Sequence, residues 1–224
     1  MGFILFVMTL ILGIDEAGRG SVIGSLFIAG IMAEEKDLDK LKEIGVKDSK
    51  LLLHKKRVEL EIEIKKIAKK VKVIKVFPKE IDEAVESDHL NLNWLEAHKQ
   101  AEIINELKPD KAVIDCPSPN IKAYTNYLID LLNNKEVELI VEHHADTNFV
   151  ICGAASIVAK CEREKEVLEL KKKYGNIGPG YSSNPITQKF VKENLDKHSE
   201  IFRKSWMTYK NHDNARKQRK IDEF

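Results

Sequence analysis

The sequence predicts an α/β fold in which helices flank a mixed central sheet. Two apolar runs, residues 3–14 and 25–33, open the chain, and unbroken runs are typical of strands buried on both faces. The tight turn between them indicates an antiparallel pair. Further along, short apolar stretches alternate with helical ones, which indicates parallel crossovers and a sheet covered on both sides. With 224 residues, 43% of them hydrophobic, the chain suits one large domain or one domain with a small appendage.

The elements up to residue 107 are predicted from composition, periodicity and turn residues. Stretches rich in Lys and Glu favour helices, whereas alternation of apolar residues favours a strand. Pro78 suits the first turn of a helix. The expected elements are a helix over 35–43, a turn over 45–50, a helix over 54–70, a strand over 71–77, and helices over 78–87 and 91–107.

The second half of the chain alternates strand and helix more regularly. The expected elements are a strand over 111–116, a helix over 121–132, a strand over 137–143, a long helix over 149–173, a turn-rich loop over 175–185 and a helix over 186–202. The remaining residues are polar, and we expect them to fray. The loop is the best candidate for a domain boundary.

Composition excludes few classes of function. Lys and Arg (37) nearly balance Asp and Glu (36), so net charge does not mark a nucleic-acid protein, although residues 210–220 are basic. The three cysteines form no Cys-x-x-Cys pair and predict reduced thiols in a cytoplasmic protein. The N-terminal apolar run has no basic leading segment or cleavage site and is too short to span a bilayer, so we expect no membrane association. Met8 is a candidate alternative start to Met1.

Carboxylates follow three of the predicted strands. Asp15 and Glu16 come directly after the first, Asp115 follows Ala112–Ile114, and Asp146 follows the strand over 137–143. In α/β sheets, ligands gather beyond the carboxyl ends of the strands. Converging carboxylates repel one another unless they bind a hard divalent cation such as Mg²⁺ or Mn²⁺, and no His or Cys set indicates zinc. Two such ions about 4 Å apart are the usual arrangement for in-line displacement at phosphorus.

Each acid also has a plainer interpretation. Asp115 precedes Cys-Pro-Ser-Pro and is placed to begin a turn, and Asp146 is placed to cap the following helix. His143 and His144 are expected to be turn residues, not metal ligands. The three strand ends together favour the metal site over these separate roles.

A glycine turn follows the first two acids. Gly18, Arg19 and Gly20 can approach a phosphate closely, through the arginine and through exposed backbone amides. Lys47, Asp48, Ser49 and Lys50 form a second candidate phosphate site, or an ordinary solvated loop. Tyr181 lies among glycines, where an exposed ring can stack on a base or sugar, or can pack in a small core.

These motifs occur in the order seen in ribonuclease HII, and the chain resembles an archaeal member of that family from about Leu10 to Trp206. The segments in common are Gly13-Ile-Asp-Glu-Ala-Gly-Arg-Gly20, Lys47-Asp-Ser-Lys50, Val113-Ile-Asp115, Ala154-Ala-Ser-Ile-Val-Ala-Lys160 and Gly180-Tyr181. The resemblance implies a ribonuclease H-like catalytic domain, which we place over 1–178, and a helical substrate-binding segment over 179–224. It implies a metal-dependent endonuclease that cleaves the RNA of RNA–DNA hybrids and nicks duplex DNA at single ribonucleotides.

The resemblance also implies roles for single residues. Asp15, Glu16, Asp115 and Asp146 match the four catalytic, metal-binding carboxylates. The turn over Gly18–Gly20 is similar to one that reads the 2′-hydroxyl, and Tyr181 matches a tyrosine that stacks at the junction of ribonucleotide and deoxyribonucleotide. Further matches, on the phosphate side, are Lys47, Asp48, Ser49, Lys50, Ser156 and Lys160. Water would attack on the 5′ side of the ribonucleotide and leave 5′-phosphate and 3′-hydroxyl ends.

Two departures from the family pattern lie near the substrate positions. Ser21 and Ser25 stand where the family commonly has proline. The tyrosine loop contains Ser182 and Asn184 where proline and aspartate are common. These changes remove rigidity or charge, and we expect them to affect rate and preference more than the type of reaction.

Three rival interpretations and one possible partner remain. The spacing of Gly18, Gly20 and Gly24 approximates the fingerprint of a dinucleotide-binding oxidoreductase. That fingerprint should open a helix, whereas a strand is expected after Gly24, which argues against this class. A non-catalytic nucleic-acid binder would not need clustered acids, and another nuclease of the same fold would not need Tyr181.

The C-terminal tail, which ends at Phe224, is a candidate for docking a sliding clamp. We expect a monomer.

Overall fold

A computed structural model describes residues 8–46 and 54–222 of the chain, without the side chains of 219–222. The chain forms two compact units that interleave along the sequence. Unit 1 comprises residues up to Glu16 together with 28–74 and 96–161. Unit 2 comprises residues 17–27, 75–95 and 162–224. The division of the chain at residue 178 stays a prediction.

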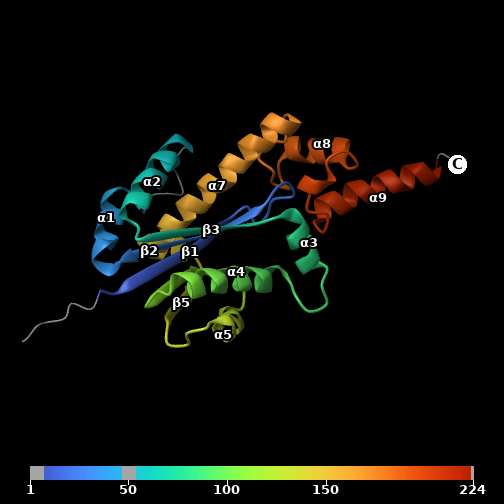
Figure 1. Cartoon of the computed structure of the whole chain (residues 1–224). Coiled ribbons are helices and arrows are strands. Elements are labelled where there is room, and N and C mark those ends of the chain that lie inside the picture. Colours follow the sequence, from blue (N-terminus) through green and yellow to red (C-terminus); the bar gives the residue numbers. More distant parts are fainter. Residues whose placement is uncertain (1–7, 47–53, 223–224) are drawn as a thin grey trace, which may run out of the picture. The chain divides into compact units, whose positions relative to one another are not determined.

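Five strands form one mixed sheet, as the sequence predicts (Figure 1). The strand order is β3-β2-β1-β4-β5, and β4 pairs in parallel with both β1 and β5. The parallel pairing confirms the crossovers expected from the alternation of strand and helix. The strands are β1 Leu10–Ala17, β2 Leu26–Glu34, β3 Lys70–Val76, β4 Lys111–Asp115 and β5 Glu138–Glu142.

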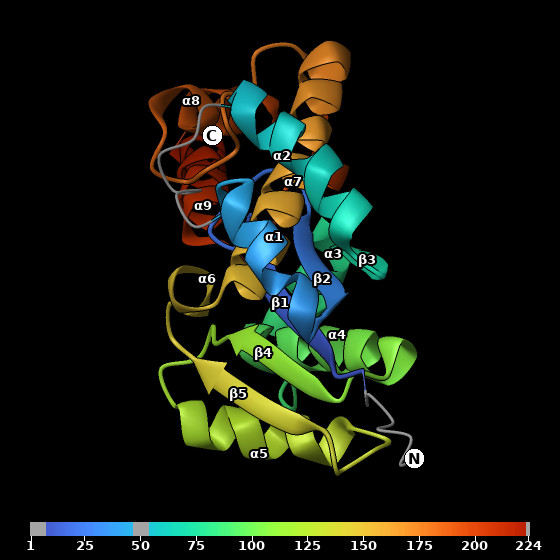
Figure 2. The same cartoon turned by 90° about the vertical axis from the view of Figure 1, so that its left-hand side faces the viewer.

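Helices account for most of the remaining described residues, and α5 packs beside β5 (Figure 2). The helical elements are η1 Glu35–Asp37, α1 Leu38–Glu43, α2 His54–Ile67, α3 Pro78–Val85, α4 Leu92–Leu107, α5 Ile121–Leu131, α6 Ala145–Asn148, α7 Val150–Tyr174, α8 Pro185–Asn194, η3 Ser199–Ile201 and α9 Met207–Asp222. Within the described residues, no helix is both long and apolar enough to cross a membrane.

Local sequence explains where several helices begin. The side chain of Asn120 accepts a hydrogen bond from the N–H of Ala123 (3.0 Å) and caps α5. Asn184 accepts from Ile186 and Thr187 at the start of α8, and Pro185 occupies the first turn. Proline is favoured there because its missing N–H would have no partner within the helix.

In unit 1, helix α7 packs very closely on β1. A Cβ atom at Gly13 would lie 2.3 Å from the backbone of Ile151, so only glycine permits this approach. The thiol of Cys152 donates to the carbonyl of Ile14 at 3.0 Å. One helical turn further along α7, Ser156 is fully buried. The close packing therefore fixes the helix beside the strand that bears Asp15.

Unit 2 has its own hydrophobic core, built from three distant parts of the chain. Val22 and Ile23 follow the glycine turn and pack with Ile177 and with residues of α8 and η3. The ring centroids of Phe190 and Phe202 are 6.2 Å apart. Further members of the core are Val191, Leu195 and Ile201.

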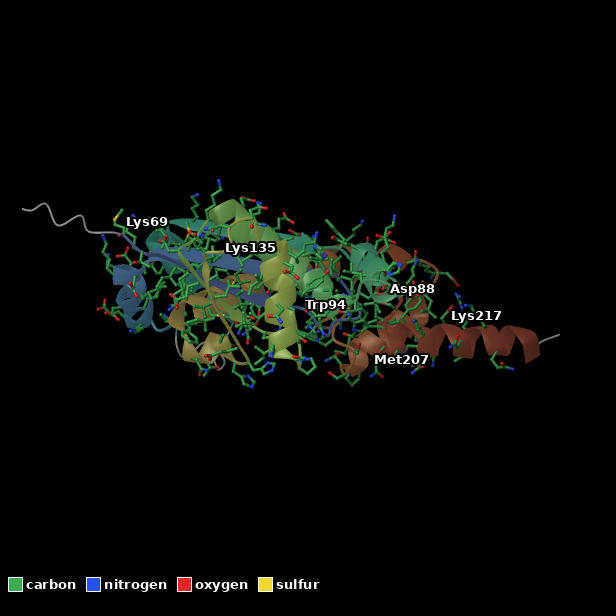
Figure 3. All side chains as sticks on the ribbon, turned by 90° about the horizontal axis from the view of Figure 1, so that it is seen from below. Lys69, Asp88, Trp94, Lys135, Met207 and Lys217 are labelled. Atoms are coloured by element: carbon green, nitrogen blue, oxygen red, sulfur yellow. The ribbon has the colours of Figure 1, made fainter. Side chains whose placement is uncertain are left out.

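The C-terminal third differs from the prediction in two places. One helix was expected over 186–202, but α8 ends at Asn194, and only the short η3 precedes Phe202. The polar end was expected to fray, but it forms α9, in which acid–base pairs such as Arg216 with Asp213 stabilise successive turns. Met207 begins this helix and is 67% exposed (Figure 3).

Candidate active site

Three carboxylates from separate parts of unit 1 come together. Asp15, Asp115 and Asp146 each place one oxygen within 4.8 Å of the others, and they are the one such group among the described residues. Asp15 is buried, and Asp146 is 9% exposed. The sequence predicted this convergence, although Asp15 and Glu16 lie within β1, which continues to Ala17, and do not follow the strand.

The sheet and a short helix bring the three acids together. β1 and β4 are neighbours in parallel register, with Ile14 opposite Ile114, so the next residue on each strand is an aspartate. After β5 the chain turns at His144, whose φ of 62° is left-handed, and α6 begins with Asp146 in its first turn. The N–H of Ala145 donates to Asp115 Oδ1 at 3.2 Å. This bond ties α6 to the end of β4.

Burial of the acids makes ionisation costly. Desolvation, reinforced by the charge of Asp115, raises the pKa of Asp15 to about 7 in spite of the lowering effect of a hydrogen bond from Ser156. Desolvation also raises the pKa of Asp115, with a contribution from the charge of Asp146. A bound cation would offset these costs, because it favours the ionised carboxylates.

Ser156 and Lys160 lie one turn apart on α7, and both act on Asp15. The Lys160 ammonium donates to Ser156 Oγ at 2.8 Å, and the Ser156 hydroxyl hydrogen-bonds with Asp15. The positive charge of Lys160 also lowers the pKa of Asp15 slightly. The sequence placed both residues on the phosphate side, and the structure places them beside the first carboxylate.

The donor set fits a hard divalent cation. Carboxylate oxygens are the ligands preferred by Mg²⁺ and Mn²⁺. The nearby thiol of Cys152 is buried, which raises its pKa well above the ordinary value, so it stays protonated and is a poor ligand. The backbone N–H of Glu16 donates to Asp15 at 2.7 Å, but the Glu16 carboxylate is not one of the three that converge.

The glycine turn lies in unit 2. Gly18 has a φ of 89°, and its carbonyl accepts a hydrogen bond from the N–H of Ser21 (3.2 Å), which closes the turn. The Arg19 guanidinium donates to Asn93 at 2.6 Å, and Gly20 is exposed with open space around its α-carbon. Tyr181 pairs with Ser21 in an isolated β-bridge, and its side chain is 42% exposed. The turn and the tyrosine are therefore held together.

Two predictions remain, one for the segment Lys47–Lys50 and one for the histidine pair His143 and His144. Lys47, Asp48, Ser49 and Lys50 lie outside the described residues. His143 and His144 are exposed at the end of β5, and His143 Nδ1 lies 3.2 Å from the carbonyl of Cys116. This position agrees with the turn role expected for both histidines.

Sequence reasoning missed three buried charged residues of unit 2. Arg163 and Glu166 on α7 and Arg203 after η3 are each at least 90% buried. Arg203 donates from Nε to the carbonyl of Gly24 (2.9 Å) and from Nη1 to that of Arg19 (2.7 Å). The available signal was the spacing of Arg163 and Glu166, which share the helix face of Val167 and Leu170 and are charges within an apolar stripe.

Comparisons with known proteins agree with this geometry. The sequence profile of Ribonuclease HII matches residues 12–209. Ribonuclease HII of Methanococcus maripaludis strain C6 is 44% identical over 207 residues, which cover 90% of this chain and 86% of that protein. The crystal structure of ribonuclease H2 from Pyrococcus horikoshii OT3 superposes with a TM-score of 0.85 at 37% identity, over 92% of this chain and 98% of that one.

A second solved structure comes from a complex. Ribonuclease HII in the PCNA:RNase HII complex of Archaeoglobus fulgidus has a TM-score of 0.78 at 38% identity and covers 87% of this chain and 92% of that one. The profile match spans nearly the whole described fold and includes Asp15, Asp115 and Asp146. The chain belongs to the ribonuclease HII family of divalent-metal-dependent endoribonucleases, which act on RNA–DNA hybrids.

Proposed function

We propose that this chain, beyond hybrid cleavage, nicks duplex DNA on the 5′ side of a single embedded ribonucleotide and leaves 5′-phosphate and 3′-hydroxyl ends. The observation that supports the chemistry most directly is the convergence of Asp15, Asp115 and Asp146 within 4.8 Å. Glu16 completes the proposed set of ligands and catalytic residues. Two ions, Mg²⁺ or Mn²⁺, would be held by these four carboxylates.

The protein groups in this mechanism orient and tune one another. When bound, paired divalent cations activate the attacking water and stabilise the leaving oxygen. Asp15 must be ionised to take part, and the hydroxyl of Ser156 helps by donating a hydrogen bond to the charged carboxylate. Lys160 orients that hydroxyl from 2.8 Å and adds positive charge on the phosphate side.

Recognition of the ribonucleotide is assigned to unit 2. The exposed backbone at Gly20 leaves room for a sugar to approach the turn over Gly18–Gly20, where peptide N–H and carbonyl groups can contact a 2′-hydroxyl. The half-exposed ring of Tyr181 can stack on the neighbouring nucleotide. Arg19 of unit 2 and the segment Lys47–Lys50, which belongs to unit 1, are proposed to contact phosphates.

The test uses a labelled DNA duplex with one ribonucleotide, in Mg²⁺, in Mn²⁺ and in EDTA. We expect a single nick 5′ to the ribonucleotide with either metal, no nick in EDTA, and loss of nicking in Asp115→Asn. Asp130→Asn, which changes an exposed acid on α5, is the matched control and should cleave like the wild type. Tight binding without nicking in any metal would contradict the proposal.

A second role, docking to a sliding clamp, is proposed for the C-terminal tail. The relative from Archaeoglobus fulgidus was solved in complex with PCNA. In this chain, α9 precedes the last residues and carries exposed side chains such as Lys217 (Figure 3). Gel filtration with an archaeal clamp should show a complex that the variant lacking residues 217–224 does not form. Equal binding by the truncated chain would exclude the tail as the docking site.

We also propose that the free chain is a cytoplasmic monomer.

A further inference from the structure

Arg163 and Glu166 form a buried ion pair that faces the glycine turn and the tyrosine loop of unit 2. The two side chains are one turn apart on α7, with Arg163 Nη1 3.1 Å from Glu166 Oε2. Arg163 is 3% exposed and Glu166 7% exposed. A buried pair of this kind is favourable only where further hydrogen bonds compensate its charges, and every side-chain nitrogen and oxygen of this pair except Arg163 Nε has a partner. Their partners therefore show what the pair holds in place.

The guanidinium of Arg163 connects two loops that are far apart in sequence. Its Nη2 donates to Ser21 Oγ (3.2 Å) and to the carbonyl of Ile23 (2.8 Å), just after the glycine turn. The same atom lies 3.4 Å from the carbonyl of Pro179, two residues before Tyr181. One planar group thus contacts both loops at once.

The carboxylate of Glu166 fixes the far end of the turn segment. It accepts from the backbone N–H of Ser25 at 2.8 Å and from the Ser25 hydroxyl at 2.6 Å. Lys75 on β3 adds a contact at 3.2 Å. Both serines are essentially inaccessible, at 0% for Ser21 and 1% for Ser25, so these bonds do not compete with water.

The tyrosine loop packs directly onto the guanidinium. A Cβ atom at Gly180 would lie 2.4 Å from Arg163 Nη2, so any larger residue would displace the loop or the arginine. The Gly180 carbonyl accepts from the N–H groups of Val22 (2.9 Å) and Ile23 (3.1 Å). The spacing between the glycine turn and Tyr181 is therefore set by the Arg163 side chain together with these backbone hydrogen bonds.

We propose that Arg163 and Glu166 are positioning residues for ribonucleotide discrimination. By fixing the segment Ser21–Ser25 and the loop before Tyr181, they set the distance between the backbone that reads the sugar and the ring that stacks beside it. Neither residue contacts the substrate in this proposal. The inference depends on the proposed role of the turn and Tyr181 in recognising the ribonucleotide.

The test compares Arg163→Lys, Ser21→Ala and Ser25→Ala with the wild type. Lysine keeps the charge but lacks the planar fork that reaches both loops. We expect kcat/KM on the single-ribonucleotide duplex to fall about tenfold to a hundredfold in Arg163→Lys, and less in the serine variants. Affinity for an all-deoxy duplex of the same sequence, and Mn²⁺ affinity, should stay unchanged. Lys165→Gln, which alters an exposed ion pair on the same helix, is the matched control.

The results separate positioning from general stability. A merely structural role would lower the melting temperature and the active fraction while leaving the preference for ribonucleotide over all-deoxy duplex unchanged, and that result would overturn the proposal. If Arg163→Lys does not fold, Ser21→Ala and Ser25→Ala, which remove one hydroxyl each, decide the question. A wild-type chain that fails to nick the ribonucleotide duplex would refute the proposed function itself, whereas normal wild-type nicking with unchanged variants would refute only the positioning role.

Discussion

The carboxylate cluster of unit 1 and the buried ion pair of unit 2 bury charge in opposite ways. Around Asp15, burial makes ionisation costly and the charge of Asp115 adds to that cost, so the pKa of Asp15 rises to about 7. Around Glu166 there are donors on every side: a guanidinium, an ammonium, a hydroxyl and a backbone N–H. The first region gains from a cation supplied from outside, whereas the second is already neutralised by its own chain.

The two regions differ because one must bind a cation and the other must hold a backbone segment rigid. A site that must bind metal keeps its anions poorly compensated, because full internal pairing would remove the affinity for the cation. A region that presents backbone to a ligand needs rigidity instead, and a buried ion pair with several hydrogen bonds to that backbone provides it. Removal of an acid should therefore have opposite consequences for stability in the two units.

The largest expected effect is on catalysis in unit 1. Asp115→Asn should lower the rate of hybrid cleavage by about a thousandfold or more, since a lost metal ligand removes several kcal/mol of transition-state stabilisation. Initial rates on a labelled RNA–DNA hybrid measure this directly. Activity within about tenfold of the wild type would mean that this carboxylate is not needed for metal binding.

The next largest effect is on the free energy of unfolding, which should change in opposite directions when an acid is removed from unit 2 and from unit 1. Glu166→Ala leaves the Arg163 guanidinium buried without its carboxylate and should lower the free energy of unfolding by about 3–5 kcal/mol. Asp15→Asn removes a poorly compensated anion and should instead raise the stability of the metal-free protein at pH 8. Urea unfolding of both variants in EDTA provides the comparison, and a change of the same sign in both would refute it.

The pH dependence of the metal-free protein follows from Asp15. Its folded-state pKa of about 7 exceeds the ordinary value of 3.8, so the folded state binds the proton more tightly than the unfolded chain. This contribution to stability is present below pH 3.8 and is lost as the pH rises to about 7, with an upper limit of about 4 kcal/mol. Thermal unfolding in EDTA should show this loss in the wild type but not in Asp15→Asn. Equal slopes would show that Asp15 does not titrate in this range.

The smallest effect concerns the cap of α8. Asn184→Ala removes the acceptor for the N–H groups of Ile186 and Thr187 and should cost about 1 kcal/mol. The melting temperature reports it, and Asn194→Ala near the end of the same helix serves for comparison. A change as large as that of Glu166→Ala would mean that the cap of α8 stabilises the fold as much as the buried ion pair does.

The sequence predicted the sheet and the acids because both depend on local signals. Apolar runs and their alternation with helices marked the strands, and Asp15, Asp115 and Asp146 stood out at strand ends. Tertiary contacts decided the remainder. Nothing in the run Ser199–Ile201 indicates that α8 must stop at Asn194 so that Phe202 can enter the core.

The supporting charges were missed for a similar reason. Arg163 and Glu166 follow the predicted helical period, yet a helix rich in Lys and Glu offers many such pairs, and only the fold shows which is buried. Arg203 lies in an irregular segment without periodicity. The partners of Ser21 and Ser25 could not be predicted either: both hydroxyls are held by the buried pair, and the expected effect of these serines on rate and preference stays a prediction.

The interleaving of the two units has a consequence for biosynthesis. Gly24 donates to the carbonyl of Ile201, and Arg203 reaches back to Gly24 across 179 residues. The segment after Glu16 therefore leaves the ribosome early but finds its packing partners only when nearly the whole chain has been made. Long-range contacts of this kind form slowly, because the intervening chain must first be ordered. The surface that we propose reads the sugar is thus among the last parts of the nascent protein to become native.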